Sequence, residues 1–124
     1  MVAYHAADLL WATRIKAMGQ DVGVECRPVR SVQMLEAWLA DSDVRGLIVD
    51  LDSPELSLEL IRALRGGEGA PGRDPEKKIR IGAFGPHIAV ELFEKAKEAG
   101  ADGVLARGAF DRRLGEVLKE LEAR

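Results

Sequence analysis

The chain has 124 residues, 47% of them apolar and 31% charged, which is the size and composition of one ordinary globular domain. Its net charge of −3, with basic residues dispersed among acids, excludes a phosphate-neutralising surface, and no apolar stretch approaches the roughly 20 residues that cross a bilayer. The N-terminus also lacks the layout of a secretion signal, so we expect one cytoplasmic domain over residues 1–124, with no nucleic acid and no membrane among its partners.

The first half of the chain alternates short β-like runs with amphipathic helical patterns. The first run covers residues 2–6, and Asp8 then caps a helix. The second run covers residues 22–29, and Ser31 caps the helix that follows it. The third run, at 46–51, is a continuous apolar segment of the kind that forms a buried strand.

The next segment is expected to contain a helix and a long loop. Pro54 starts the helix, and "RGG" at 65–67 ends it. Residues 66–78 are rich in glycine, proline and charge, and we interpret them as a surface loop rather than a linker between domains. The fourth β-like run follows at 79–84.

Two more helices are expected in the last third of the chain. Pro86 opens the first of them, with Ile88 on its inner face, and Gly100 ends it. After a β-like run at 103–106, apolar residues recur in steps of three and four from Phe110 onward. Five strands that alternate with helices predict an α/β fold with a parallel sheet and helices on both faces.

Ligands of such a fold bind beyond the carboxyl ends of the strands. The residues just after these ends are Asp8, Asp50, Asp52, Gly85, Pro86, Arg107 and Gly108. For Asp8 and Asp52 the simpler interpretation is helix capping and loop solvation. Asp50 differs, because it continues the apolar run without a turn, and a partly buried carboxylate needs a cation or hydrogen-bond donors.

Two segments resemble the receiver domains of bacterial response regulators. They are "LIVDLDSP" at 47–54 and "AKEAGADGVLARGAF" at 96–110. The resemblance implies a flavodoxin-like (βα)5 three-layer sandwich with a five-stranded parallel sheet in the order 2-1-3-4-5. It makes Asp50 the phosphoacceptor-like position, and Asp52 the position whose backbone carbonyl binds Mg²⁺.

Other parts of the family's site do not carry over. The acid pair that holds Mg²⁺ in receivers aligns with Ala6 and Ala7, and the switching Ser or Thr aligns with Gly85. The family's lysine aligns with Arg107, and its cis-proline with Gly108. We therefore expect no cofactor, with at most weak Mg²⁺ binding at Asp50.

A guanidinium can form a planar, bidentate pair with a carboxylate. We therefore expect Arg107 to hold Asp50 in a permanent ion pair without metal or phosphate. His5 and His87 also fall near strand ends, and we expect each to be either hydrogen-bonded or exposed. His87 follows Pro86 in the first turn of a helix, where backbone donors could contact an anion.

Several enzyme and cofactor classes are excluded. The cobalamin-binding domains that share "AKEAGADGV" need an Asp-x-His-x-x-Gly segment, which is missing here. "HAADLLWAT" is too bulky for the phosphate loop of an FMN site, and no strand-end Ser or Cys has a histidine at a suitable spacing. We expect a protein that is not an enzyme.

We expect a stand-alone pseudo-receiver that acts in signalling through protein–protein contact without phosphotransfer. The partner is unknown, and a homodimer through residues 88–120 is possible, over the surface of 88–99 and 107–120. The charged positions expected on it are Glu91, Glu94, Lys95, Glu98, Asp102, Arg112, Arg113, Glu116 and Lys119. Two alternatives stay open: a single-domain response regulator phosphorylated on Asp50, and a small-molecule sensor using the crevice at Gly85 and Pro86.

Overall fold

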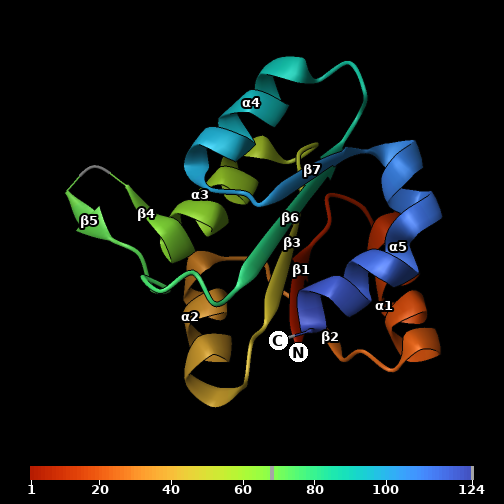
Figure 1. Ribbon diagram of the computed structural model, residues 1–124, viewed down its shortest axis with the longest axis horizontal. Coiled ribbons are helices and arrows are strands. Elements are labelled where there is room, and N and C mark those ends of the chain that lie inside the picture. Colours follow the sequence, from red (N-terminus) through yellow and green to blue (C-terminus); the bar gives the residue numbers. More distant parts are fainter. Residues whose placement is uncertain (68, 124) are drawn as a thin grey trace.

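A parallel sheet runs through the centre of the computed structural model, which describes residues 1–67 and 69–123 (Figure 1). The strand order is β2-β1-β3-β6-β7, and every neighbouring pair is parallel. When only the five strands of this sheet are counted along the chain, β6 is the fourth and β7 the fifth, so the order is the predicted 2-1-3-4-5. The strands are β1 (Val2–His5), β2 (Cys26–Pro28), β3 (Gly46–Asp50), β6 (Arg80–Gly85) and β7 (Gly103–Ala106).

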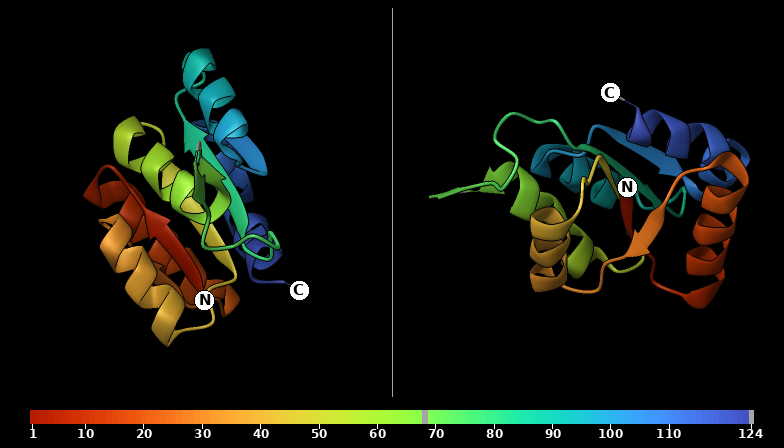
Figure 2. Two further views of the ribbon diagram at one scale, coloured as in Figure 1. Left: turned by 90° about the vertical axis from the view of Figure 1, so that its left-hand side faces the viewer. Right: turned by 90° about the horizontal axis from the view of Figure 1, so that it is seen from below.

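Helices cover both faces of this sheet (Figures 1 and 2). They are α1 (Leu9–Val22), α2 (Val32–Asp41), α3 (Pro54–Arg65), α4 (Val90–Ala99) and α5 (Arg107–Glu122). One core joins the sheet to α1 and α5 around Ile15, Phe84 and Leu118, and the other joins it to α2, α3 and α4 around Leu47 and Leu60. Within the described residues, no helix combines the length and apolarity needed to span a membrane.

The helix starts follow from local chemistry. The side chains of Asp8 and Ser31 accept hydrogen bonds from backbone N–H groups of the first turns of α1 and α2, as predicted. Pro54 is the first residue of α3, where its missing N–H removes no helical bond. Gly66 ends that helix with a φ of 86°, a conformation that suits glycine.

The second strand is shorter than the predicted run at 22–29. Helix α1 continues through Val22, and Gly23 ends it in the left-handed conformation with a φ of 76°. Only Cys26–Pro28 then pairs with β1. The apolar character of Val22 and Val24 reflects packing against the core rather than membership of the sheet.

The segment 66–78 was predicted as a plain surface loop, and this is wrong in part. It begins with a short antiparallel ribbon, β4 (Gly66–Gly67) and β5 (Ala70–Pro71), which projects from the body of the molecule (Figures 1 and 2). Asp74 then turns inward and is buried. The rest of the segment is therefore anchored to the fold.

Helix α4 starts later than predicted. Residues 86–89 form a turn closed by a hydrogen bond from the N–H of Ala89 to the carbonyl of Pro86, at 2.9 Å. Ile88 was expected on the inner face, but it is 77% exposed. A proline at the first helical position favours a helix without forcing one, and here the turn satisfies the backbone instead.

Candidate functional site

Asp50 ends β3 and is fully buried, with 0% of its surface exposed. One carboxylate oxygen accepts from the backbone N–H of Ala7 at 2.8 Å, and the other accepts from that of Asp52 at 3.0 Å. Burial raises the pKa of Asp50, while the Ala7 hydrogen bond and the charge of Arg107 lower it. Backbone donors are therefore the direct partners of this buried carboxylate.

The expected ion pair between Arg107 and Asp50 is wrong. Arg107, the first residue of α5, forms its ion pair with Asp52, and both side chains are partly exposed. Its charge still acts on Asp50 at longer range. Because Asp50 is satisfied by backbone N–H groups, the guanidinium is available to the more accessible carboxylate two residues on.

The site does not fit the Mg²⁺ ion that the receiver resemblance implies. Ala6 and Ala7 stand where acids would be needed, and Asp8 uses its Oδ1 to cap α1 by accepting from the N–H of Trp11 at 2.9 Å. Among the described residues, no three His, Cys, Asp or Glu side chains are grouped so that they could hold a metal ion. Weak Mg²⁺ binding at Asp50 remains a prediction.

Gly85 is buried at the end of β6, and its size matters. A Cβ atom added there would lie 3.1 Å from the Cβ of Leu51 and 3.3 Å from the ring of Phe93. A Ser or Thr hydroxyl would therefore require these neighbours to move. The packing leaves little room for a ligand against Gly85.

Pro86 and His87 lie in the turn that follows β6. Pro86 is partly exposed, and His87 is exposed. The placement of His87 in the first turn of a helix is wrong, since α4 begins at Val90. The backbone N–H donors at the start of α4 therefore lie further along the chain than His87, where they were expected.

His5 meets the expectation only in part, because it is buried and forms a hydrogen bond with the backbone of Val29 through one ring nitrogen alone. It is 8% exposed, and its Nε2 has no hydrogen-bond partner. Burial lowers its pKa, while the charge of Asp50 and a hydrogen bond with the backbone of Val29 raise it. The signal in the sequence is the place of His5 in β1, because both faces of this interior strand are buried and His5 shares one of them with Ala3.

The fold is that of bacterial receiver domains. The chain superposes on a putative response regulator from Chloroflexus aurantiacus with a TM-score of 0.77 and 19% identity, covering 99% of this chain and 97% of that one. For the receiver domain of NtrX from Brucella abortus, the TM-score is 0.77 and the identity 16%, with 98% of this chain and 97% of that one covered. For a response regulator from Thermotoga maritima, the TM-score is 0.73 and the identity 18%, with 97% of this chain and 94% of that one covered. No protein-family model and no curated protein matches the sequence.

Proposed function

We propose that this protein is a pseudo-receiver, which acts in signalling through protein–protein contact and does not transfer phosphate. The observation that carries the proposal is the burial of Asp50. The carboxylate at the phosphoacceptor-like position has no exposed surface, and both of its oxygens accept backbone hydrogen bonds. An attacking carboxylate oxygen must reach the phosphoryl donor, so this arrangement opposes the reaction.

Charge stabilisation around Asp50 is also weak. Phosphoryl transfer needs cations or hydrogen-bond donors on the oxygens of the transferred group. Ala6 and Ala7 supply no carboxylate for a metal ion, Gly85 supplies no hydroxyl, and Arg107 is bound to Asp52. The chain keeps the receiver fold while the donors that the reaction needs are missing or engaged.

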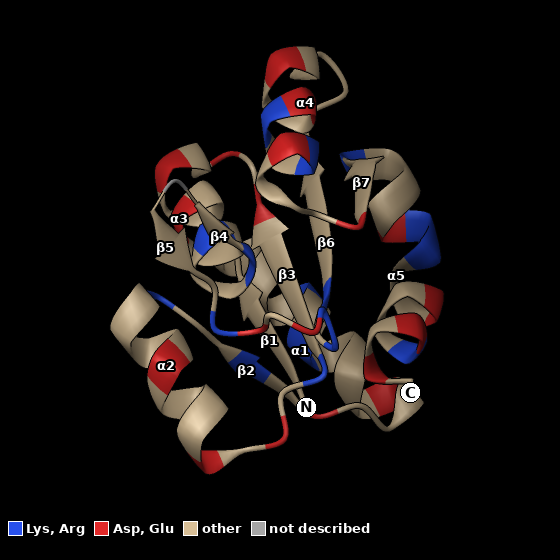
Figure 3. Cartoon of the chain, turned by 60° about the vertical axis from the view of Figure 1, so that its left-hand side comes forward, with Lys and Arg blue, Asp and Glu red and all other residues tan. Residues whose placement is uncertain are grey.

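The surface of α4 and α5 supports a role in protein contact. All nine charged positions predicted there are exposed, and Figure 3 shows both signs of charge on the two helices. At the start of this surface, Ile88 is 77% exposed and Val90 is 62% exposed. Aliphatic side chains rimmed by mixed charges are typical of specific protein interfaces.

The proposal is tested by incubation with acetyl phosphate and Mg²⁺, followed by intact-mass measurement. We expect no phosphate adduct on the parent protein under conditions that phosphorylate a competent receiver run in parallel. An added phosphate on the parent that is absent from Asp50→Asn would establish the alternative, a response regulator phosphorylated on Asp50.

A further inference from the structure

A groove lies on the side of β1 that faces away from β3, beyond the point where β2 ends. We call it the β1–α1 groove, and it is formed by the end of β1, the first turns of α1 and the connection from β2 to α2. Its volume is about 420 Å³, which is within the range of small-molecule sites, from about 300 Å³ upward.

Chain geometry creates this groove. Strand β2 stops at Pro28, and directly after it the N–H of Val29 donates a backbone hydrogen bond to the carbonyl of Tyr4 in β1, at 2.8 Å. On this side the chain of β1 continues past that point with no strand beside it, while His5 still pairs with β3 on the other side. Ala6 and Ala12 also line the groove, and their short side chains leave it open.

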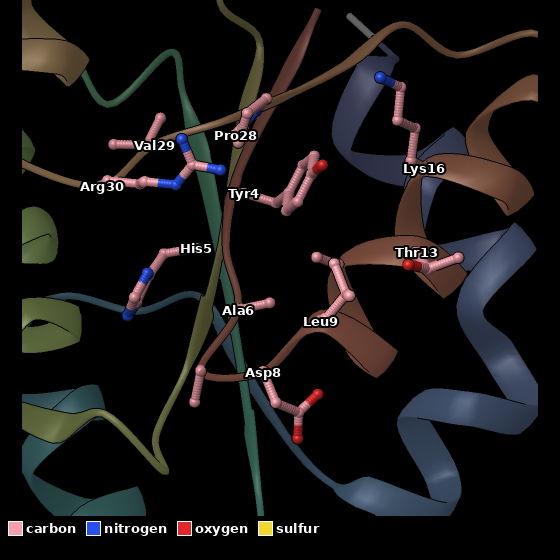
Figure 4. A pocket seen from close by; sticks show the side chains of 12 residues that line it. Tyr4, His5, Ala6, Asp8, Leu9, Thr13, Lys16, Pro28, Val29 and Arg30 are labelled. Carbon is pink, nitrogen blue, oxygen red and sulfur yellow. The ribbon is translucent and has the colours of Figure 1, made fainter.

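The two ends of the groove differ in charge. Arg30 and Lys16 stand on opposite walls toward one end, with the ring of Tyr4 between them, and Asp8 lies toward the other end (Figure 4). Burial and the neighbouring Cys26 raise the pKa of the Tyr4 hydroxyl, while the positive charge of Arg30 lowers it. Among the described residues, neither Arg30 nor Lys16 forms an ion pair.

We propose that the β1–α1 groove binds a nucleoside monophosphate or another small molecule that carries a phosphate at one end and a base at the other. Two cations and a phenolic hydroxyl suit a dianionic phosphate, which the guanidinium of Arg30 and the ammonium of Lys16 contact from opposite sides. Leu9 and Ala12 supply apolar surface for the base. The carboxylate of Asp8, at the far end, accepts from an amine or hydroxyl of the ligand.

This site is distinct from the surface of α4 and α5, and it needs neither phosphotransfer nor a protein partner. It also differs from the crevice at Gly85 and Pro86, where Leu51 and Phe93 fill the space. A bound nucleotide would give the protein a ligand-dependent input that does not involve Asp50.

Isothermal titration calorimetry with AMP, GMP, adenosine and inorganic phosphate tests the proposal. We expect saturable binding of at least one nucleoside monophosphate, and binding at least about tenfold weaker for both adenosine and phosphate. The double variant Lys16→Gln/Arg30→Gln should lose about tenfold or more in affinity. The matched control Arg62→Gln/Lys97→Gln removes the same charge from exposed positions of α3 and α4 and should bind like the parent.

A third variant tests the groove without changing its charge. Thr13 is exposed on the α1 wall, and Thr13→Trp should fill the groove and abolish binding while the melting temperature stays within about 2 °C. Three results would each overturn the proposal: no binding of either nucleotide at about 5 mM, phosphate binding as tightly as the nucleotides, or equal losses in the charge variant and its control.

Discussion

Asp50 shows how a carboxylate at the end of a core strand is accommodated without a cation in contact. The N–H groups of Ala7 and Asp52 approach its two oxygens, and the hydroxyl of Ser57 donates to its carbonyl at 2.5 Å. Arg107, which lies close enough to influence the pKa of Asp50, is paired with Asp52 instead. The two acids of "DLD" therefore have different roles, one inside the protein and one at its surface.

The partly exposed pair of Arg107 and Asp52 should contribute little to stability. We expect Arg107→Ala to change the free energy of unfolding by less than about 1 kcal/mol, since solvent screens such pairs and ordering the side chains opposes them. Urea denaturation measures the change. A loss of several kcal/mol would show instead that Arg107 is the main partner of the buried Asp50.

Asp50 should also make stability depend on pH. Burial raises the pKa of Asp50 in the folded protein above the ordinary value of 3.8. The contribution of Asp50 to the free energy of unfolding is therefore complete at pH values below the pKa in the unfolded chain, and it is lost as the pH rises through the pKa in the folded protein. Asp50→Asn removes this titration.

The free energy of unfolding of the parent, minus that of Asp50→Asn, should therefore fall as the pH is raised from about 3.5 to 7. Urea denaturation of both proteins at several pH values gives this difference. A difference that rises with pH would mean that the folded protein favours the charged carboxylate.

At the scale of elements, Arg65 connects four segments near the end of the sheet that is opposite to Asp50. It is the last residue of α3, and its side chain is 6% exposed. Its guanidinium binds the carboxylates of Asp74 at 3.0 Å and Asp102 at 2.9 Å, and it donates to the carbonyls of Ile79 at 2.6 Å and Gly100 at 3.2 Å. One side chain thereby holds the segment after β5 and the starts of β6 and β7 against α3.

Arg65→Ala should therefore destabilise the protein strongly, by on the order of 3 kcal/mol, because it leaves Asp74 buried without its cation. The matched control is Arg62→Ala, in the same helix at an exposed position, which should stay within about 0.5 kcal/mol of the parent. Urea midpoints of both variants give the comparison. Equal effects would mean that helix propensity, rather than the Arg65 contacts, is responsible.

At the scale of the whole molecule, the large apolar side chains that are exposed within the described residues form two pairs. Ile88 and Val90 precede and begin α4, and Leu9 and Leu10, which are 80% and 64% exposed, begin α1. The first pair adjoins the mixed charges of α4 and α5, the surface through which a homodimer is predicted from the sequence. The second pair has similar exposure and chemistry, so it provides a control elsewhere on the fold.

If the predicted homodimer forms through α4 and α5, it would bury these side chains, so sedimentation velocity at about 100 μM should show a dimer for the parent and a monomer for Ile88→Ser/Val90→Ser. Leu9→Ser/Leu10→Ser should remain dimeric. A monomeric parent, or a dimer that the Leu9 and Leu10 changes disrupt equally, would contradict self-association through α4 and α5.

The sequence by itself determined the α/β alternation, the strand order implied by the receiver resemblance, the caps at Asp8 and Ser31, and the burial of Asp50. The alternation, the caps and the burial of Asp50 depend on periodicity and on contacts a few residues apart, which are visible along the chain, whereas the strand order came from the resemblance alone. Only the tertiary structure decided that Arg107 meets Asp52, that Arg65 binds Asp74 and Asp102, and that His5 is buried with Nε2 unpaired. The physical reason is that several charges of opposite sign lie within reach of one another at the sheet ends, and the choice among them depends on backbone placement to within about an ångström.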